Sequence, residues 1–275
     1  MRPAMGTLLH VSASGTNTKA TEQALDDAIA AVERVDRLMS FHSPDSELSR
    51  LNREAVRAPQ QVDPWTYAVL RRALRISDLS DGLFDVSVAP VLVREGLLPQ
   101  ATDTLPDRGS WRDISLLPDS RVAFRQPILI DLGGIAKGFA VDMAIHLLRA
   151  AGCTEASVNA GGDLRRFGVH SQTIHLRRAS GLIPVAQLRC GAVATSAPYL
   201  SDEQRLAQPL GHIVDPRAQT FWKGSGAVMV AARSCVMADA LTKVAALAGP
   251  ACGPLLAHLG ARALWDADSV PTEQC

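Results

Sequence analysis

The sequence has few aromatic residues, no excess of charge of either sign and no long apolar run. Only 4% of the 275 residues are aromatic, and 28 basic side chains match 28 acidic ones. Neither a base-stacking platform nor the basic surface that binds a phosphate backbone is therefore indicated, so we expect no nucleic-acid partner. No run of eighteen apolar residues occurs, and we expect no membrane-spanning helix.

Cysteine is scarce and shows no pairing pattern. The five cysteines are widely spaced and include no CxxC pair: Cys153, Cys190, Cys235, Cys252 and Cys275. This spacing argues against a zinc knuckle or a disulfide framework and is typical of free thiols in a reducing compartment. The N-terminal stretch MRPAMGTLLHVSASG has no sustained apolar core and no cleavage site, so no signal peptide is predicted. We expect a cytoplasmic protein as the sequence stands, or a periplasmic one if the N-terminus is incomplete.

Apolar periodicity predicts a mixture of helices and strands. A hydrophobic fraction of 47% can form a sizeable core in one domain or in two tightly joined lobes. Helices are predicted over 18–39, 136–151 and 236–248, and Asp63-Pro64 opens another that Gly82 closes. Strands are predicted at 5–14, 128–130, 156–159, 174–177, 183–188, 192–195 and 226–232, with loops over 97–125. Because no regular βαβ rhythm connects them, we predict an α+β fold.

The stretch DLGGIAKGFAVD, residues 131–142, has the composition of an anion site. Gly133 and Gly134 allow a sharp turn and a close approach to a ligand. The helix that follows offers unpaired amides and the positive end of its dipole, with Lys137 in its first turn. A pyrophosphate would fit there. The alternative is a tight turn with a solvated lysine.

Two further segments combine glycine or proline with a polar side chain. NAGGD, residues 159–163, suits a nucleotide-lined rim, although a hairpin turn would use the same residues. GHIVDP, residues 211–216, places His212 before a turn. This histidine is a candidate proton acceptor, and a purely structural role is the alternative.

The stretch MADALTKVAAL, residues 237–247, places three functional groups on one helix face. Asp239, Thr242 and Lys243 are spaced i, i+3 and i+4. The carboxylate and the hydroxyl could hold Mg²⁺ beside phosphates. A plain surface ion pair between Asp239 and Lys243 is the alternative.

Two segments in the first third of the chain suggest a cleft for a ring system. MSFHSPDSELSRLN, residues 39–52, supplies Ser46, Glu47 and Asn52, and GLFDVSVAP, residues 82–90, supplies Phe84 and Asp85. Ser46 and Glu47 could instead belong to a helix cap.

The order of these motifs along the chain resembles the ApbE family of FAD:protein FMN transferases. The likeness runs from Met5 to Leu247 and rests on MGT, MSxxxPxSELSRLN, GLFDVSVAP, DLGGIAKGFAVD, NAGGD, ATSxxY, HIVDP and ADAL. It implies a two-lobed, T-fold-like structure with FAD in the cleft between the lobes. Residues 1–275 would form this single domain, with 249–275 as a peripheral C-terminal segment. The acceptor would be a Thr or Ser of another protein, such as a subunit of a membrane redox complex.

The resemblance also assigns individual residues. It implies that a set of residues contacts FAD: Met5, His42, Leu83, Phe84, Asp85, Gly133, Lys137, Phe139 and Ile213. It implies that His212 acts as the base or orients the acceptor, and that Mg²⁺ is held by three groups: the Ala136 carbonyl, the Asp239 carboxylate and a hydroxyl four residues after Asp239.

The chain departs from the family pattern at three places. The family reads ADAxxT, whereas Lys243 stands here at the threonine position and Thr242 precedes it. A protonated lysine cannot ligate Mg²⁺. Either Lys243 replaces the cation near the pyrophosphate, or Thr242 coordinates the metal and Lys243 contacts phosphate. His42 stands where Tyr is frequent, and Ala197-Pro198 where a glycine follows TS.

We therefore predict an enzyme that cleaves FAD and attaches FMN to a protein hydroxyl. Asp239 and His212 are the predicted catalytic residues, with Lys137 and Lys243 beside the phosphates. The rivals are an FAD hydrolase, in which water replaces the hydroxyl, a flavin-binding protein without catalysis, and a scaffold that binds no flavin.

Overall fold

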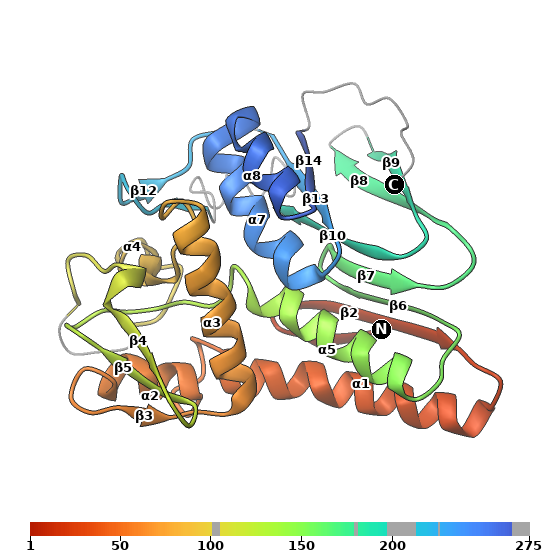
Figure 1. Ribbon diagram of the computed structural model, residues 1–275, viewed down its shortest axis with the longest axis horizontal. Coiled ribbons are helices and arrows are strands. Elements are labelled where there is room, and N and C mark those ends of the chain that lie inside the picture. The colour runs from red at the N-terminus through yellow and green to blue at the C-terminus, as the bar shows by residue number, and fades with distance from the viewer. Residues whose placement is uncertain (101–104, 179–180, 197–212, 225, 266–275) are drawn as a thin grey trace.

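The computed structural model describes residues 1–100, 105–178, 181–196, 213–224 and 226–265 (Figure 1). Its centre is a seven-stranded antiparallel sheet of order β1-β2-β6-β7-β10-β13-β14. The strands are β1 (Arg2–Ala4), β2 (Thr7–Ser14), β6 (Glu155–Ala160), β7 (Asp163–Phe167), β10 (Gly191–Ser196), β13 (Val228–Ala232) and β14 (Arg262–Trp265).

Three helices form a layer on one face of this sheet. They are α1 (Thr18–Met39), α5 (Ala136–Ala150) and α7 (Cys235–Ala248). In this layer α1 packs on β2 and α5, and α5 packs on β6, β7 and α7, while α7 covers β10 and β13. The helix α1 buries residues at helical spacing, and Asn17 caps its first turn by accepting a hydrogen bond from the Ala20 amide at 3.0 Å.

A hairpin of β8 (Gln172–Arg178) and β9 (Gly181–Leu188) contributes to a second apolar cluster at the sheet. Its buried members are Leu164, Ile174, Leu176, Val185, Leu188, Val193, Ala227 and Met229. This cluster is separate from the main core, so the sheet has apolar packing beyond that provided by the helix layer.

A second group of elements, which includes α3, lies beside the helix layer (Figure 1). It contains α2 (Glu47–Glu54), α3 (Pro64–Leu79), a three-stranded sheet of β3 (Gln60–Gln61), β5 (Arg121–Phe124) and β4 (Ile114–Leu117), the 3-10 turns η1 (Val86–Val88) and η2 (Trp111–Asp113), α4 (Ala89–Arg94) and the short pair β11 (Val214–Asp215) and β12 (Thr220–Phe221). One buried apolar cluster contains side chains of α2 and α3 together with those of α1, α5, α7 and the main sheet.

The predicted α+β class is confirmed, and the four predicted helices are present. Asp63 caps α3 by accepting from the Trp65 amide at 2.9 Å, and Pro64 is the first helical residue, as predicted. Two local predictions are wrong. The stretch 97–125, predicted as loops, contains the hairpin β4–β5, and 128–130 is buried but forms no strand.

The C-terminal segment that begins at Gly249 is more integral than we expected. Its described part contains η3 (Gly249–Cys252), α8 (Gly253–His258) and β14, which pairs with β13 at the edge of the central sheet. Among the described residues, the stretch Cys235–His258 is long and apolar enough to cross a membrane by length and composition. The helix α7 within this stretch packs against α5, β10 and β13, so many of its apolar side chains face the protein's own core.

Candidate active site

Two lysines and two carboxylates meet where α5, β7 and α7 converge. Lys137 Nζ lies 3.2 Å from Asp163 Oδ2 and 3.9 Å from Asp239 Oδ2, and Lys243 Nζ is bonded to Asp239 Oδ1. The side chains of Asp163 and Asp239 are only 4% and 1% exposed, whereas those of Lys137 and Lys243 are 28% and 20% exposed. We call these four residues the charged quartet.

A close approach of α5 to α7 assembles this quartet. A Cβ atom on Gly138 would lie 2.3 Å from the Cys235 carbonyl oxygen and 2.8 Å from Asp239 Cβ, so only glycine permits the approach. The Gly138 amide belongs to the first turn of α5 and has no partner within the helix. It donates instead to Asp239 Oδ2 at 3.1 Å, which places a carboxylate at the positive end of the α5 dipole.

The protonation of the quartet follows from burial and pairing. Burial favours the neutral form of Asp239, but Lys137, Lys243 and the Gly138 amide outweigh it and lower the pKa of this carboxyl. Burial likewise opposes the charge of Lys137, but Asp239 and Asp163 outweigh it and raise the pKa of this lysine. Burial and the neighbouring Asp239 raise the pKa of Asp163 to about 6. Asp239 and Lys137 are therefore both charged at neutral pH.

The hydroxyl of Thr242 is used inside the protein, on the same backbone carbonyl oxygen that Lys243 Nζ contacts. It donates to the Asp239 carbonyl oxygen at 2.6 Å and lies 2.7 Å from Ser196 Oγ, at the end of β10. Its residue is 0% exposed. Because Thr242 gives its only hydrogen to the backbone, the Ser196 hydroxyl is the donor in their contact.

A pocket opens beside the quartet, and Lys243 belongs to both. Its walls come from the 83–88 segment, the 131–134 loop and the start of β11, with residues Leu83, Phe84, Asp85, Val86, Val88, Leu92, Asp131, Gly134, Ile213, Val214, Pro216 and Lys243. An apolar lining with one aromatic ring and a few charged groups is typical of a small-molecule site. Predicted FAD contacts Leu83, Phe84, Asp85 and Ile213 all lie in this wall.

The stem of Lys243 lies close to Gly134 in this wall. A Cβ atom on Gly134 would lie 3.3 Å from Lys243 Cε and 3.7 Å from Phe84 Cε2. The lysine therefore passes along the 131–134 loop next to the Phe84 ring and ends on Asp239.

Asp85 and Asp131 are the carboxylates of the pocket wall. Asp85 Oδ1 accepts from the Ser87 amide and hydroxyl, both at 2.8 Å, and Oδ2 accepts from the Trp111 amide at 3.1 Å. Burial outweighs these bonds and raises the pKa of Asp85. Burial also raises the pKa of Asp131, opposed by the Gly133 amide, by Lys137 and by the exposed His42. Asp85 thus holds two loops together, and His42 lies within electrostatic range of the pocket.

Four other predicted site residues lie outside the pocket wall. Gly133 is exposed, and its carbonyl accepts from Lys137 Nζ at 3.2 Å. Met5 forms a tight turn with φ of 51° and donates its amide to Asp36 Oδ2 at 3.1 Å. Phe139 is buried and meets Trp65 edge-on at 6.1 Å between ring centroids. Ala136 is buried as the first residue of α5. The predicted base, His212, lies outside the described residues.

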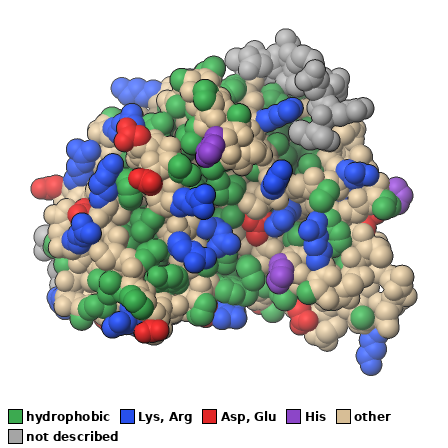
Figure 2. Space-filling view, viewed as in Figure 1, with side chains coloured by type: hydrophobic (Ala, Val, Ile, Leu, Met, Phe, Trp, Pro, Cys, Tyr) green, Lys and Arg blue, Asp and Glu red, His purple; other side chains and the backbone are tan. Residues whose placement is uncertain are grey.

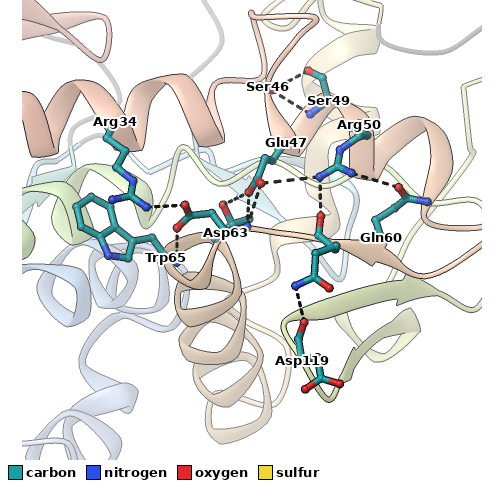
Figure 3. A network of polar contacts seen from close by, with 11 residues as sticks. Arg34, Ser46, Glu47, Ser49, Arg50, Gln60, Asp63, Trp65 and Asp119 are labelled. Carbon is teal, nitrogen blue, oxygen red and sulfur yellow. Dashed lines mark hydrogen bonds and ion pairs between the residues drawn. The ribbon is translucent and has the colours of Figure 1, made fainter.

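Ser46 and Glu47 of the SELSRLN segment bond to neighbouring parts of the protein (Figure 3). Ser46 caps α2 by accepting from the Ser49 amide at 3.0 Å. Glu47 accepts from the Asp63 amide at 2.9 and 3.0 Å and from the Thr66 hydroxyl at 2.7 Å, which ties α2 to the start of α3. The helix-cap alternative is confirmed for Ser46, and the pocket described above is lined by neither Ser46 nor Glu47.

Basic side chains gather near the middle of the face shown in Figure 2, over the region where α3 meets α5 and α7. One arginine of α3, Arg72, lies with its guanidinium carbon 5.6 Å from the centre of the Phe139 ring of α5. Positive charge on this face would attract an anionic ligand over distances comparable to the Debye length.

Local sequence signals for Asp163, Asp131 and Ser196 were weaker. In NAGGD the hairpin alternative is confirmed, because Gly161 and Gly162, with φ of 63° and 102°, form the turn between β6 and β7. Asp163 follows that turn as the first residue of β7 and is 3% exposed. A carboxylate directly after a pair of glycines, at the first position of a strand, is the signal that could have identified it.

Comparisons with known proteins agree with these motifs. The model of the ApbE family matches residues 5–265. A Vibrio cholerae protein named FAD:protein FMN transferase is 28% identical over 261 residues, which cover 87% of this chain and 78% of that protein. A protein of the same name from Rhodobacter capsulatus is 28% identical over 279 residues. The match covers 94% of this chain and 53% of the Rhodobacter capsulatus protein.

The fold has solved relatives. The structure of the flavinyl transferase ApbE from Pseudomonas stutzeri, in its apo form, superposes with a TM-score of 0.81 and covers 96% of this chain and 88% of its own. At 22% sequence identity this likeness concerns the fold.

Proposed function

The chain belongs to the ApbE family, and we propose that it transfers FMN from FAD to a Ser or Thr hydroxyl of an acceptor protein. One observation carries this proposal beyond family membership. The apolar pocket that contains Phe84 ends at Lys243, whose ammonium is anchored on buried Asp239 next to Lys137. A flavin ring suits the apolar wall, and a pyrophosphate suits the two lysines.

The reaction can be written with all atoms in balance. The acceptor oxygen attacks the phosphorus that carries riboflavin, and the bond from this phosphorus to the bridging oxygen of FAD breaks. AMP leaves with the electron pair, and the hydroxyl proton passes to a base, the role we propose for His212. Lys137 and Lys243 would stabilise the charge that grows on the phosphate oxygens. Asp239 holds both lysines in place, so we propose that it positions the site.

The Mg²⁺ that the family resemblance implies does not fit the donor groups as they are arranged here. Asp239 Oδ1 is bonded to Lys243 and Oδ2 to the Gly138 amide. The Thr242 hydroxyl is used by the Asp239 carbonyl oxygen and by Ser196. Among the described residues, no group of three or more His, Cys, Asp and Glu side chains could hold a metal ion. We therefore propose no step that passes through the metal.

The acceptor would be a protein with one accessible Ser or Thr, and we propose a redox-complex subunit. The test is mass spectrometry of such a subunit after incubation with this protein and FAD. We expect an FMN adduct on one hydroxyl residue and stoichiometric AMP. Phe84→Ala should weaken FAD binding, and Asp239→Asn should reduce transfer.

Three results would contradict the proposal in different ways. Rapid release of AMP and free FMN without an adduct would indicate an FAD hydrolase. Tight FAD binding without turnover would indicate a flavin-binding protein. Absence of FAD binding would indicate a scaffold protein that binds no flavin.

A further inference from the structure

We infer that the ammonium group of Lys243 takes the place of a divalent cation in this site, so that the protein handles FAD without Mg²⁺. The inference rests on the proposed function for its substrate. Its structural basis, the contacts of Lys243 with Asp239, does not depend on that function.

The contacts of Lys243 are those that a cation would make. Its Nζ is bonded to Asp239 Oδ1 and lies 3.0 Å from the Asp239 backbone carbonyl oxygen. A carboxylate and a backbone carbonyl are the oxygen ligands that hard cations prefer. The i, i+4 spacing on α7 lets the lysine reach both oxygens from its own helix. An ion at this carboxylate would have to displace the ammonium group.

The charges of the quartet balance without an added ion. Asp163 and Asp239 carry two negative charges when ionised, and Lys137 and Lys243 carry two positive ones. A divalent cation would join a group that is already neutral, and it would be repelled by both ammonium groups at short range. Mg²⁺ also gives up its water reluctantly, so it needs several free oxygen ligands to repay that cost.

The predicted hydroxyl ligand, Thr242, is not among the residues that line the pocket. Thr242 is 0% exposed and has both of its hydrogen-bond contacts inside the protein, to the Asp239 carbonyl and to Ser196. Lys243, by contrast, is a member of the pocket wall. The helix face thus presents an ammonium group to the ligand where a hydroxyl would be needed to complete a metal site.

The lysine is held in place before any ligand binds. A Cβ atom built on Gly134 would lie 3.3 Å from Lys243 Cε and 3.7 Å from the Phe84 ring, so the stem runs close to this loop. The ammonium group is bonded to Asp239. Lys243 therefore loses little side-chain freedom on meeting a phosphate, which suits a built-in counter-charge.

The first experiment measures AMP release from FAD in the presence of the acceptor protein, once in EDTA and once in excess Mg²⁺. Transfer to the acceptor and hydrolysis by water both release AMP, so the assay reports cleavage of FAD by either route. We expect the wild-type rate to agree within about twofold between the two conditions. In Lys243→Thr, which provides a hydroxyl four residues after Asp239, the rate in EDTA should fall by about tenfold or more and be restored by Mg²⁺. Lys243→Arg keeps the positive charge, so the rate that this variant retains should be the same in EDTA and in Mg²⁺. Lys19→Thr, exposed on α1, should match the wild type.

The second experiment needs no turnover, so it separates this inference from the proposed function. Binding of Mn²⁺ is followed by electron paramagnetic resonance, with and without FAD, and FAD affinity is measured by calorimetry in EDTA and in Mg²⁺. We expect no stoichiometric Mn²⁺ site in the wild type, one in Lys243→Thr, and equal FAD affinity of the wild type in both buffers. Thermal melting confirms that each variant is folded.

A loss of wild-type activity in EDTA of about tenfold or more would overturn the inference. So would one Mn²⁺ bound per wild-type chain and lost in Asp239→Asn. If no variant transfers FMN, the proposed function fails, and Mn²⁺ binding alone then decides the question about Lys243.

Discussion

The side chain of Asn52 hydrogen-bonds both backbone groups of Ile130, which lies 78 residues further along the chain. Its amide donates to the Ile130 carbonyl at 3.0 Å, and its oxygen accepts from the Ile130 amide at 2.9 Å. Asn52 is 6% exposed and Ile130 is 0% exposed, so these bonds are shielded from solvent in the wild-type protein. The side chain takes the place of a strand partner for the backbone that leads into the 131–134 loop.

Replacing Asn52 by alanine should destabilise the protein by about 2–4 kcal/mol, because two buried backbone groups lose their partners. Urea denaturation of the variant measures this change. Gln23→Ala, on the exposed face of α1, is the control and should stay within about 0.5 kcal/mol of the wild type. An Asn52→Ala variant as stable as this control would show that water or a rearranged loop satisfies Ile130.

This pair also explains why the sequence misled us at 128–130. Three consecutive apolar residues bounded by a turn predict a buried strand, and the stretch is indeed buried. A strand needs a neighbouring strand, however, and here the partner is a side chain from α2. No local pattern indicates such a long-range bond. The hairpin β4–β5 was missed for a different reason. The Pro, Asp and Gly residues around its two short strands are typical of loops, and they outnumber the apolar residues of the strands in that segment.

The long helices were predictable because their apolar spacing and caps are local signals. The site was predictable only in its parts. The sequence placed Asp239 and Lys243 on one helix face and Lys137 in the first turn of another. That Gly138 brings these helices together, and that Asp163 joins them from β7, depends on tertiary packing. The orientation of the Thr242 hydroxyl likewise depends on Ser196, a residue of β10.

Substituting Gly138 by alanine should destabilise the protein by about 1–3 kcal/mol, because the added methyl group overlaps the Cys235 carbonyl and forces α5 and α7 apart. The Gly138 amide would then move away from Asp239, so FMN transfer should also fall. Chemical denaturation and the transfer assay check the two effects.

Gly253→Ala is the matched control for that substitution. Gly253 opens α8, and a Cβ atom there meets nothing within 4 Å. Alanine should therefore be neutral or slightly stabilising. Equal stability of the Gly138 and Gly253 variants would contradict the close packing of α5 on α7.

Glu47→Ala should lower stability by about 1–3 kcal/mol, because the Asp63 amide and the buried Thr66 hydroxyl lose their acceptor. The affinity for FAD should not change, since the carboxylate is used between α2 and α3 and is not in the pocket wall. Denaturation and calorimetry with FAD measure the two quantities. A large loss of FAD affinity in a folded variant would show that Glu47 contributes to the FAD site.

The pH dependence of stability should carry a contribution from Glu155. A hydrogen bond with His170, and the charges of His170 and Arg166, lower the pKa of Glu155 below its ordinary value of 4.5. A lowered pKa in the folded state means that the ionised carboxylate is favoured by folding. The stabilisation is therefore present above about pH 4.5 and is lost as the pH falls through the folded-state pKa.

Glu155→Gln tests this, since glutamine keeps the size and removes the charge. The free energies of unfolding of wild type and variant should differ most near neutral pH and converge in acid, in a urea series between about pH 2 and pH 7. His170→Ala, which keeps Glu155 but removes its first partner, should reduce the same pH-dependent difference. A gap between wild type and Glu155→Gln that widens as the pH falls would reverse the sign of the linkage. It would show that the folded protein favours the neutral, protonated form of Glu155.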